Sequence, residues 1–367
     1  MKKFLSVVLA LVMALGISAV AFAAENEAEP ETASTGSIKI LDMNVDGLPV
    51  PAGLSKDNKS PIKSANSIIE FINKNSADIV STQENFNFFP MYKTKLSYDN
   101  ISAYNGGAAV GDGLAVASKY KLWNVKHVPW NVACGVLDCG SDELTPKGFM
   151  VATIEIEDGV YVDYYTLHAD ACEDEGSLQA KRDQFDQLCD FIDSYSADRA
   201  VILAGDFNSN YTIVLGDVLR DKFVARGFKD TWIETQNGGD YSPSYSELYE
   251  RYGKVNYWGY YDCLDKVYYR DGSNLKFEAK THDYVFCYTN NQDGERVLAT
   301  DHAAIITELE YKTVKADMQS INLKAERRTT VFTLLFRAAK TIVKDIFLLI
   351  KQIPALIAGD TKLDWMK

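Results

Sequence analysis

Short apolar runs separated by polar turns dominate the chain between residues 37 and 311. Some runs alternate polar and apolar positions, as SIKILDMNV does over residues 37–45, and others are continuously apolar, as AVILA is over residues 200–204. The first pattern is typical of half-buried β-strands and the second of fully buried ones. The predicted strands are residues 37–45, 77–82, 113–118, 149–156, 160–167, 200–204, 264–269 and 302–311.

Apolar positions at helical spacing predict two helices in the same region, one starting at Pro61 and one covering residues 177–195 with Ser177 as its N-cap. Their apolar faces are Ile62, Ala65, Ile68, Ile69 and Ile72 in the first, and Leu178, Phe185, Leu188 and Ile192 in the second. Because strands come both in succession and alternating with helices, we expect a mixed α/β sandwich. Residues 234–262 are rich in Tyr, Gly, Ser and Asn, and we expect a long surface excursion there.

The first 36 residues are predicted to lie outside this fold. Lys2 and Lys3 precede an apolar run, and Ala21-Phe22-Ala23 has the small-x-small pattern of a signal-peptide cleavage site. We therefore expect a signal peptide over residues 1–23, an acidic disordered spacer over residues 24–36, and a secreted protein that could associate with the membrane or cell surface. An uncleaved membrane anchor is the alternative.

The C-terminal residues 312–367 differ from the rest of the chain in charge. They carry 11 Lys and Arg against 5 Asp and Glu, whereas the whole chain has a net charge of −13. A broad apolar helical face extends from Val331 to Ile353 and is opposed by basic side chains. These basic residues are Arg337, Lys340, Lys344 and Lys351. The pattern predicts a basic amphipathic helix that either contacts a membrane peripherally or packs on the domain. Charges interrupt it too often for a membrane-spanning helix.

The acidic body argues against strong binding of nucleic acid through phosphate neutralisation, although a bound metal ion can supply positive charge locally. The six cysteines permit disulfides in an exported protein. Cys134 and Cys139 flank a Gly-containing turn, and we expect that pair first. The sequence has no C-x-x-C motif and no histidine cluster, so a zinc site is not expected.

Polar residues that can carry chemistry stand at the ends of many predicted strands. They are Asn44, Glu84, His168, Asp206 with Asn208, Asp265, and Asp301 with His302. Because strand ends offer rigid positions next to solvent, we expect these side chains to converge at one edge of the sheets. Each residue taken alone has a structural alternative, such as a turn, a cap or a buried histidine, so the prediction depends on the whole ordered set.

In this order, N…E…H…GDFN…D…DH resembles the endonuclease/exonuclease/phosphatase superfamily, which includes deoxyribonucleases, inositol polyphosphate phosphatases and neutral sphingomyelinases. The segments GDGLAVASKYKL and TLHADA add to the resemblance, which runs from about Ile38 to Leu309. It implies one domain over residues 37–311 with an α/β four-layer sandwich, in which two packed mixed β-sheets are flanked by helices. The C-terminal amphipathic helix would be an addition to that domain.

The resemblance also implies a metal-dependent phosphodiester hydrolase. Glu84 would hold Mg²⁺ and Asn44 would complete or support the site, with Mn²⁺ or Ca²⁺ as substitutes. A carboxylate suits a hard cation that keeps waters and binds a substrate phosphate. The ion would polarise a phosphoryl oxygen and stabilise the leaving oxygen.

The residues that the resemblance assigns to catalysis are His302, Asp301, His168, Asp206, Asn208 and Asp265. His302 would take a proton from the attacking water, with Asp301 orienting its ring. The Asp and Asn of GDFN would position water, phosphate and metal. His168, paired with Asp265, would stabilise charge on the phosphate or assist the leaving group.

Local features favour a phospholipid substrate of the sphingomyelinase type. NVDGLP and CGVLDCGSDELTPKGF resemble segments of lipid-cleaving members, and the basic tail and the aromatic residues Tyr257, Trp258, Tyr260 and Tyr261 could meet a lipid surface. Residues 287–300 are polar, however, where those members carry an apolar hairpin. The alternatives are a secreted deoxyribonuclease-like endonuclease acting on nucleic acid, a soluble phosphate-ester phosphatase, and a catalytically idle surface-binding protein.

Overall fold

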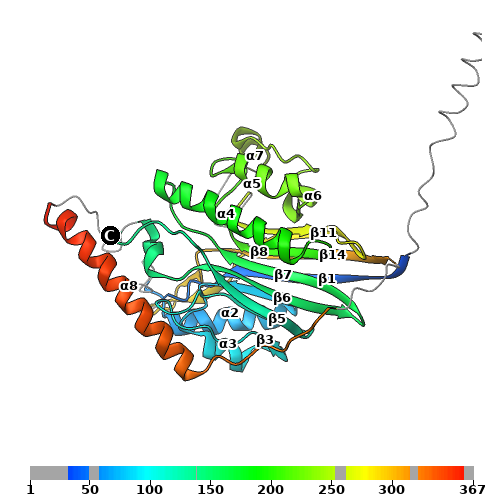
Figure 1. Cartoon of the computed structure of the whole chain (residues 1–367). Helices are drawn as coiled ribbons and strands as arrows, with labels where there is room; N and C mark the ends of the chain where they lie inside the picture. The colour runs from blue at the N-terminus through cyan, green and yellow to red at the C-terminus, as the bar shows by residue number, and fades with distance from the viewer. Residues whose placement is uncertain (1–31, 49–57, 138, 253–261, 315–320, 359–367) are drawn as a thin grey trace, which may run out of the picture. The chain divides into compact units, whose positions relative to one another are not determined.

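A computed structural model describes residues 32–48, 58–137, 139–252, 262–314 and 321–358. From residue 33 onward these belong to one compact unit, Ala33–Lys367. Two six-stranded mixed sheets pack face to face, and helices cover both outer faces (Figure 1). The predicted four-layer α/β sandwich is confirmed. No helix in the described ranges is long and apolar enough to cross a membrane.

The first sheet has the strand order β11-β14-β1-β2-β4-β3. Its strands are β1 (Thr32–Asn44), β2 (Ile79–Gln83), β3 (Asn100–Ile101), β4 (Ala115–Ser118), β11 (Leu275–Val285) and β14 (Ala304–Val314). β1 and β2 are parallel, whereas β4 runs antiparallel to β2. Helices α2 (Pro61–Asn75) and α3 (Phe89–Lys95) cover the outer face, where Ile68 and Tyr92 pack against Leu41 and Val80.

The second sheet has the strand order β5-β6-β7-β8-β10-β9. Its strands are β5 (Leu122–Pro129), β6 (Gly148–Glu157), β7 (Val160–His168), β8 (Ala200–Asp206), β9 (Lys229–Asp230) and β10 (Asp265–Arg270). β7 and β8 are parallel and β10 is antiparallel to β8. Its outer face is covered by α4 (Glu175–Tyr195), α5 (Gly216–Lys222) and α6 (Thr231–Gln236), with α7 (Tyr245–Tyr252) beyond them.

The remaining short elements are two 3₁₀ helices, η1 (Cys139–Leu144) and η2 (Val224–Arg226), and the hairpin of β12 (Tyr288–Asn290) and β13 (Arg296–Leu298). This hairpin precedes the Asp301-His302 pair, and its turn is polar as the sequence predicted. The aromatic residues Tyr257, Trp258, Tyr260 and Tyr261 lie outside the described residues.

All eight predicted strands are present, and every one of them is an interior strand of its sheet. The missed strands are the sheet edges and the β12–β13 hairpin. The long edge strand β11 alternates buried Leu275 and Phe277 with exposed Lys276 and Glu278. Charged residues on an exposed edge prevent pairing with other chains, and they also weaken the hydrophobic pattern from which strands are predicted.

Two predicted boundaries are wrong. The N-cap of α4 is Asp174, whose side chain accepts hydrogen bonds from the backbone N–H groups of Gly176 and Ser177, so Ser177 lies inside the helix. Residues 32–36, predicted as disordered spacer, form the start of β1. There, the Ser34 N–H donates to Thr313 Oγ1, which ties the beginning of the domain to the end of β14.

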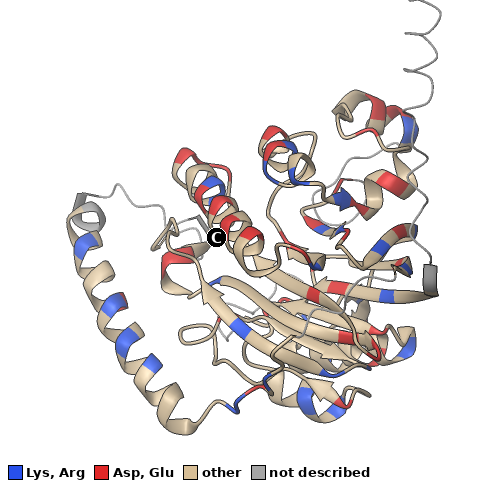
Figure 2. Ribbon diagram, turned by 45° about the vertical axis from the view of Figure 1, so that its right-hand side comes forward, with Lys and Arg blue, Asp and Glu red and all other residues tan. Residues whose placement is uncertain are grey.

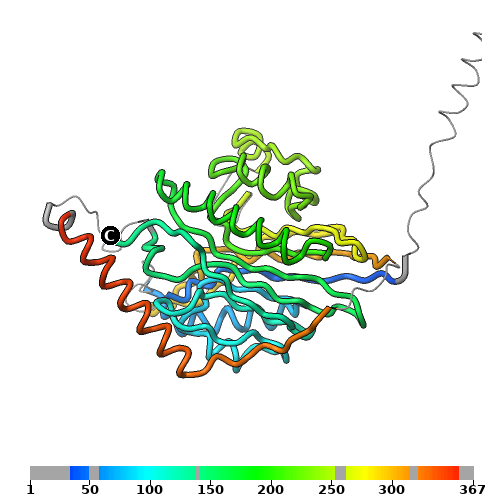
Figure 3. The backbone as a smooth tube through the Cα atoms, in the orientation of Figure 1, coloured from blue at the N-terminus to red at the C-terminus, as the bar shows by residue number. Residues whose placement is uncertain are grey.

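The predicted tail helix is present as α8 (Val331–Ala358). The segment before it is fastened along the edge strand β5, where the Asn124 N–H donates to Lys324 O at 2.8 Å and the Lys324 N–H donates to Asn124 Oδ1 at 2.9 Å. Figure 3 shows this segment in orange, leading into α8 in red. As the alternative of packing on the domain expected, Arg337 and Lys344 of α8 donate hydrogen bonds to the body, but the large apolar side chains of the helix are mostly exposed.

A fully buried polar layer crosses the space between the two sheets near their site-bearing ends. Asp42 Oδ1 accepts hydrogen bonds from Ser81 Oγ and from Gln83 Nε2, and Gln83 Nε2 also donates to Thr166 Oγ1 of the other sheet at 3.0 Å. The second oxygen, Asp42 Oδ2, is buried without a hydrogen-bond partner among the described residues. Burial raises the pKa of Asp42 to about 8 because the charged form is poorly solvated there.

This burial gives the stability of the protein a specific pH dependence. The unfolded chain ionises Asp42 near pH 3.8, whereas the folded chain retains the proton up to about pH 8, so Asp42 makes folding less favourable as the pH rises between these values. Asp42→Asn keeps the shape but cannot ionise, so we expect it to stabilise the protein by about 1–3 kcal/mol at pH 8 and much less at pH 4. Urea unfolding at both pH values tests this, and an equal effect at the two would contradict it.

Candidate active site

Three candidate residues of the second sheet lie in one row across neighbouring strands. His168 ends β7 directly beside Asp206 at the end of β8, and Asp206 lies directly opposite Asp265 at the start of β10. All three side chains are buried. Strand register therefore brings together residues that are up to 97 positions apart in the sequence.

The first sheet supplies the other side of the site. Asn44 ends β1, Glu84 follows β2, and His302 precedes β14. Glu84 has a φ of 54°, an uncommon left-handed conformation for this residue type, and this turns the chain sharply at the end of β2. Asn44 Nδ2 donates to Glu84 Oε1 at 3.1 Å and to Asp206 Oδ2 at 3.1 Å, so one amide joins the two sheets.

Asp206 Oδ2 is the atom on which the site converges. Besides Asn44 Nδ2, the ring atoms His168 Nε2 and His302 Nε2 lie 3.5 and 3.8 Å from it. Burial alone would raise the pKa of Asp206, but the two imidazoles and the hydrogen bonds from Asn208 N–H and Asn44 lower it below its ordinary value. Asp206 is therefore an anion at neutral pH.

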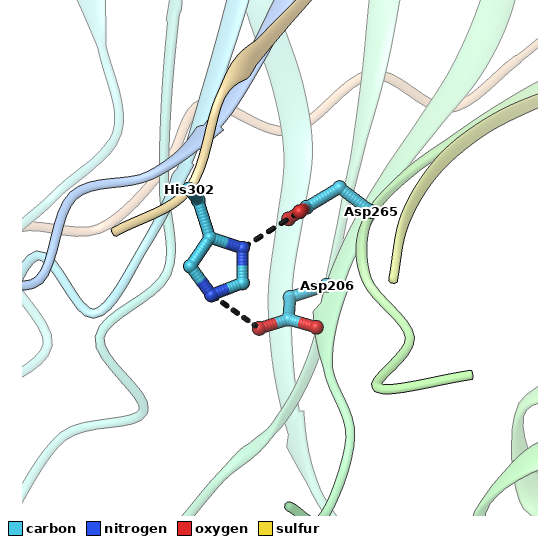
Figure 4. A group of neighbouring side chains, drawn as sticks. All are labelled: Asp206, Asp265 and His302. Carbon is cyan, nitrogen blue, oxygen red and sulfur yellow. Dashed lines mark hydrogen bonds and ion pairs between the residues drawn. The ribbon is translucent and has the colours of Figure 1, made fainter. Parts of the chain in front are cut away.

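The partner of the His302 ring is Asp265 and not Asp301. Figure 4 shows the His302 ring between two carboxylates, with Nδ1 2.7 Å from Asp265 Oδ2 and Nε2 facing Asp206. Asp301 is exposed. Burial would lower the pKa of His302, but Asp265 and Asp206 outweigh it and hold this pKa well above its ordinary value. The predicted orienting role of Asp301 is corrected, because Asp301 is exposed and the Nδ1 of the buried His302 is bonded to Asp265.

The predicted pairing of His168 with Asp265 is also wrong. Asp206 stands between them in the sheet, and His168 Nε2 lies 3.5 Å from Asp206 Oδ2 and 4.0 Å from Glu84 Oε1. Burial, together with the nearby Lys147 ammonium, lowers the pKa of His168 to about 3. His168 is therefore a neutral ring, and its Nδ1 is buried without a hydrogen-bond partner among the described residues.

Asn208 follows β8 with a φ of 47°, and its side-chain Nδ2 donates to Ala169 O at 3.1 Å. The side chain thus braces the chain that follows His168. Phe207 between the two polar residues is fully buried in the core under α4. Gly205 has no room for a side chain, because a Cβ there would lie 2.3 Å from Leu167 O.

A buried cation, Lys147, lies beside the site and was not predicted from the sequence. Lys147 pairs with the buried Asp142 of η1 and donates to Ala169 O at 3.4 Å. Burial would lower the pKa of Lys147, but Asp142 outweighs this, so Lys147 stays charged. In the sequence, Lys147 was marked only by its place directly before β6, in the segment CGVLDCGSDELTPKGF that resembles lipid-cleaving members of the family.

Two places in the site could hold a metal ion, one formed by three residues and one at Glu84. Asp206, Asp265 and His302 bring one ligand atom each within 4.8 Å of one another, but both nitrogens of the imidazole already face carboxylates. Glu84 is more open, with 18% of its side chain exposed, and burial near other carboxylates raises its pKa to about 7 despite Lys147. A divalent cation would offset this cost of ionisation, so Glu84 fits the predicted metal role.

The predicted disulfide between Cys134 and Cys139 is not formed, because Cys134 is a free thiol. The buried Cys189, Cys263 and Cys287 are also free thiols. Burial raises the pKa of Cys189 and of Cys287 to about 12, which makes both thiols poor nucleophiles.

Comparison with known proteins matches the sequence of this chain to one family. The sequence model described as "Endonuclease/Exonuclease/phosphatase family" matches residues 43–302, which include every candidate site residue. A curated sphingomyelinase of Mycobacterium bovis is 25% identical over 292 residues, covering 77% of this chain and 54% of the relative. The chain therefore spans about half the length of that relative.

Solved structures share the fold at low sequence identity. TDP2 of D. rerio, complexed with a single-stranded DNA product, is 17% identical with a TM-score of 0.54, covering 75% of this chain and 99% of its own. A mutant of beta toxin from Staphylococcus aureus with bound magnesium ions is 19% identical with a TM-score of 0.50, covering 74% of this chain and 99% of its own.

The two corrected histidine pairings predict the protonation states of the rings. We expect His302 to titrate above its ordinary pKa, while His168 and His282, both with a pKa of about 3, stay neutral down to pH 5. Asp265→Asn removes the strongest stabilisation of the imidazolium, so the pKa of His302 should fall clearly. With four histidines in the chain, NMR titration of the ring protons can follow each one.

Asp301→Asn is the matched control, because it alters the carboxylate next to His302 in sequence but not the one bonded to its ring. Asp301 raises the pKa of His302 less than Asp265 does, so Asp301→Asn should lower this pKa much less than Asp265→Asn. A larger shift in Asp301→Asn than in Asp265→Asn would restore the pairing that the sequence predicted.

Proposed function

Because the chain belongs to the endonuclease/exonuclease/phosphatase family, we propose that it hydrolyses phosphodiesters with the help of Mg²⁺, acting on phospholipids of the sphingomyelin type. One observation carries the proposal: residues from both sheets surround Asp206 Oδ2 with an amide and two imidazoles. The curated sphingomyelinase relative supports a lipid substrate. The predicted membrane contact of the tail is a separate proposal, and it would suit a substrate that lies in a bilayer.

In the proposed reaction, Glu84 would hold the metal ion, and Asn44 fixes the Glu84 carboxylate through its 3.1 Å hydrogen bond. When bound, the ion would supply positive charge to the phosphate oxygens and to the leaving oxygen. Asn44 Nδ2 faces Glu84 and Asp206, so its part is to position these carboxylates. Lys147 and the neutral His168 leave this part of the site able to accept an anionic phosphate.

His302 is the proposed base that takes the proton of the attacking water at Nε2. Asp265 fixes the ring through Nδ1 and stabilises the imidazolium once it has formed. Asp206, which faces Nε2, would orient the water toward the phosphorus atom. The high pKa of His302 makes it a strong base, of which only a fraction is neutral at pH 7.

A nuclease is the second candidate function, because TDP2 in complex with a DNA product shares the fold. The acidic body argues against it. Export by residues 1–23 stays a prediction, since these residues lie outside the described part of the chain.

One comparison separates the two candidate substrates. The purified protein with Mg²⁺ is offered sphingomyelin vesicles and plasmid DNA side by side, with EDTA as the control for metal dependence. We expect release of phosphocholine without nicking of the plasmid, and loss of release in EDTA. Nicking alone would favour the nuclease, and full activity in EDTA would exclude the metal role of Glu84.

Replacing the proposed base tests the mechanism. We expect His302→Ala to lower kcat by roughly 10²–10⁴-fold, because a positioned base contributes about that factor. His127→Ala is the matched control, since His127 also pairs with a carboxylate, Asp112 Oδ2 at 2.6 Å, but is not among the candidate site residues. Its rate should stay close to that of the unmodified protein.

The same base role sets the pH profile. Because only the neutral ring accepts a proton, the rate should rise with pH through the raised pKa of His302. A rate that falls over this pH range would instead assign His302 the role of an acid.

A further inference from the structure

Helix α8 presents a continuous apolar surface to solvent. Eleven of the seventeen exposed large hydrophobic side chains in the described ranges belong to this one helix. Phe332 is 80% exposed, Val343 70% and Phe336 69%, and none of the α8 side chains whose exposure is described is buried. Exposed apolar patches of this kind mark an interaction surface.

The apolar surface of α8 is wide and has a basic border. At 100° per residue, its exposed members spread over more than about 100° of the helix circumference. They are Val331, Phe332, Leu335, Phe336, Ile342, Val343, Ile346, Phe347, Leu349, Ile350 and Ile353. Lys340, Lys344 and Lys351 follow one another along one border, and Figure 2 shows basic positions spaced along the helix. Lys351 Nζ lies 4.6 Å from the centroid of the Phe347 ring.

Polar contacts hold α8 with this surface turned outward. Arg337 Nη1 donates to Asn105 O at 3.2 Å, and Lys344 Nζ donates to Glu143 O at 2.6 Å. Between α8 and the body lies a cavity of about 440 Å³ whose lining includes Asp112 and His127. These contacts between α8 and the body are polar, and the large exposed apolar side chains of α8 are turned to solvent.

We propose that α8 lies in the interface of an anionic lipid bilayer, with its apolar surface among the acyl chains and its basic border among the phosphate groups. A wide apolar arc with a basic border is the pattern of helices that bind in the plane of a membrane. A helix pairing with a second copy would show a narrower stripe. The C-terminal tail is basic while the body is acidic, so an anionic lipid surface attracts the tail and repels the body.

The position of α8 connects this surface with the candidate active site. Lys344 binds the carbonyl of Glu143, the neighbouring Asp142 pairs with Lys147, and Lys147 donates to Ala169 O next to His168. The bilayer-bound helix would thus hold the site-bearing end of the sheets at the lipid surface. This consequence, unlike the membrane binding itself, rests on the proposed function.

Co-sedimentation with vesicles tests the proposal on the full chain. The probes are vesicles of phosphatidylcholine with and without phosphatidylglycerol, neither of which contains sphingomyelin. Phe336→Ser/Val343→Ser/Phe347→Ser should weaken binding at least about tenfold, because the exposed side chains provide the buried apolar area. The matched control Ile62→Ser/Tyr249→Ser, which removes exposed side chains of α2 and α7, should bind like the unmodified protein.

Two further measurements complete the test. Lys340→Gln/Lys351→Gln should lose the preference for phosphatidylglycerol, and high salt should remove that preference in the unmodified protein. Hydrolysis of soluble bis(p-nitrophenyl) phosphate should be unchanged in both α8 variants, which shows that they are folded. Unweakened vesicle binding by the triple variant would overturn the proposal, as would a dimer in light scattering that the triple variant converts to monomers. Vesicle binding without hydrolysis of any lipid would overturn only the proposed function.

Discussion

The buried Asp206 carboxylate holds the two sheets together at the end where the candidate site lies. A buried anion is stable only when hydrogen bonds and opposite charges replace the lost water, and here these groups come from both sheets. Asn44 supplies the hydrogen bond from the first sheet, and His302 supplies the positive charge from the start of β14. A change in the spacing of the sheets would remove these partners, so the packing of the core and the geometry of the site depend on each other.

The sequence predicted the interior of this molecule better than its edges. Continuous or alternating apolar patterns identified the eight interior strands because both of their neighbours are other strands. The edge strand β11 was missed because Lys276, Glu278 and other solvent-facing residues dilute its pattern. The candidate site followed from the same rule, since Asn44, His168 and Asp206 stand at or near the predicted strand ends and are the last residues of β1, β7 and β8.

The pairing of the site residues could not be read from the sequence. His302 of the first sheet pairs with Asp265, 37 positions away, whereas His168 does not, because the order β7-β8-β10 places Asp206 between His168 and Asp265. The resemblance assigned the orienting role to Asp301, but Asp301 is exposed whereas the ring of His302 is buried. Lys147 was missed for a related reason: its charge is buried by tertiary contacts with η1, which no local pattern records.

The segment that leads into α8, which includes Lys324 and Ala325, also covers part of an exposed sheet edge. β5 is an edge strand, and its irregular register near Asn124 leaves backbone groups facing outward. The segment before α8 pairs with this edge, because Lys324 O accepts a hydrogen bond from the Asn124 N–H and Ala325 forms a β-bridge with Trp123. An uncovered edge is a template on which a strand of another molecule can add. A chain cut before residue 321 would lose both this cover and α8. Such a truncated protein could aggregate through the exposed edge of β5, so its properties would not reflect the loss of the helix alone.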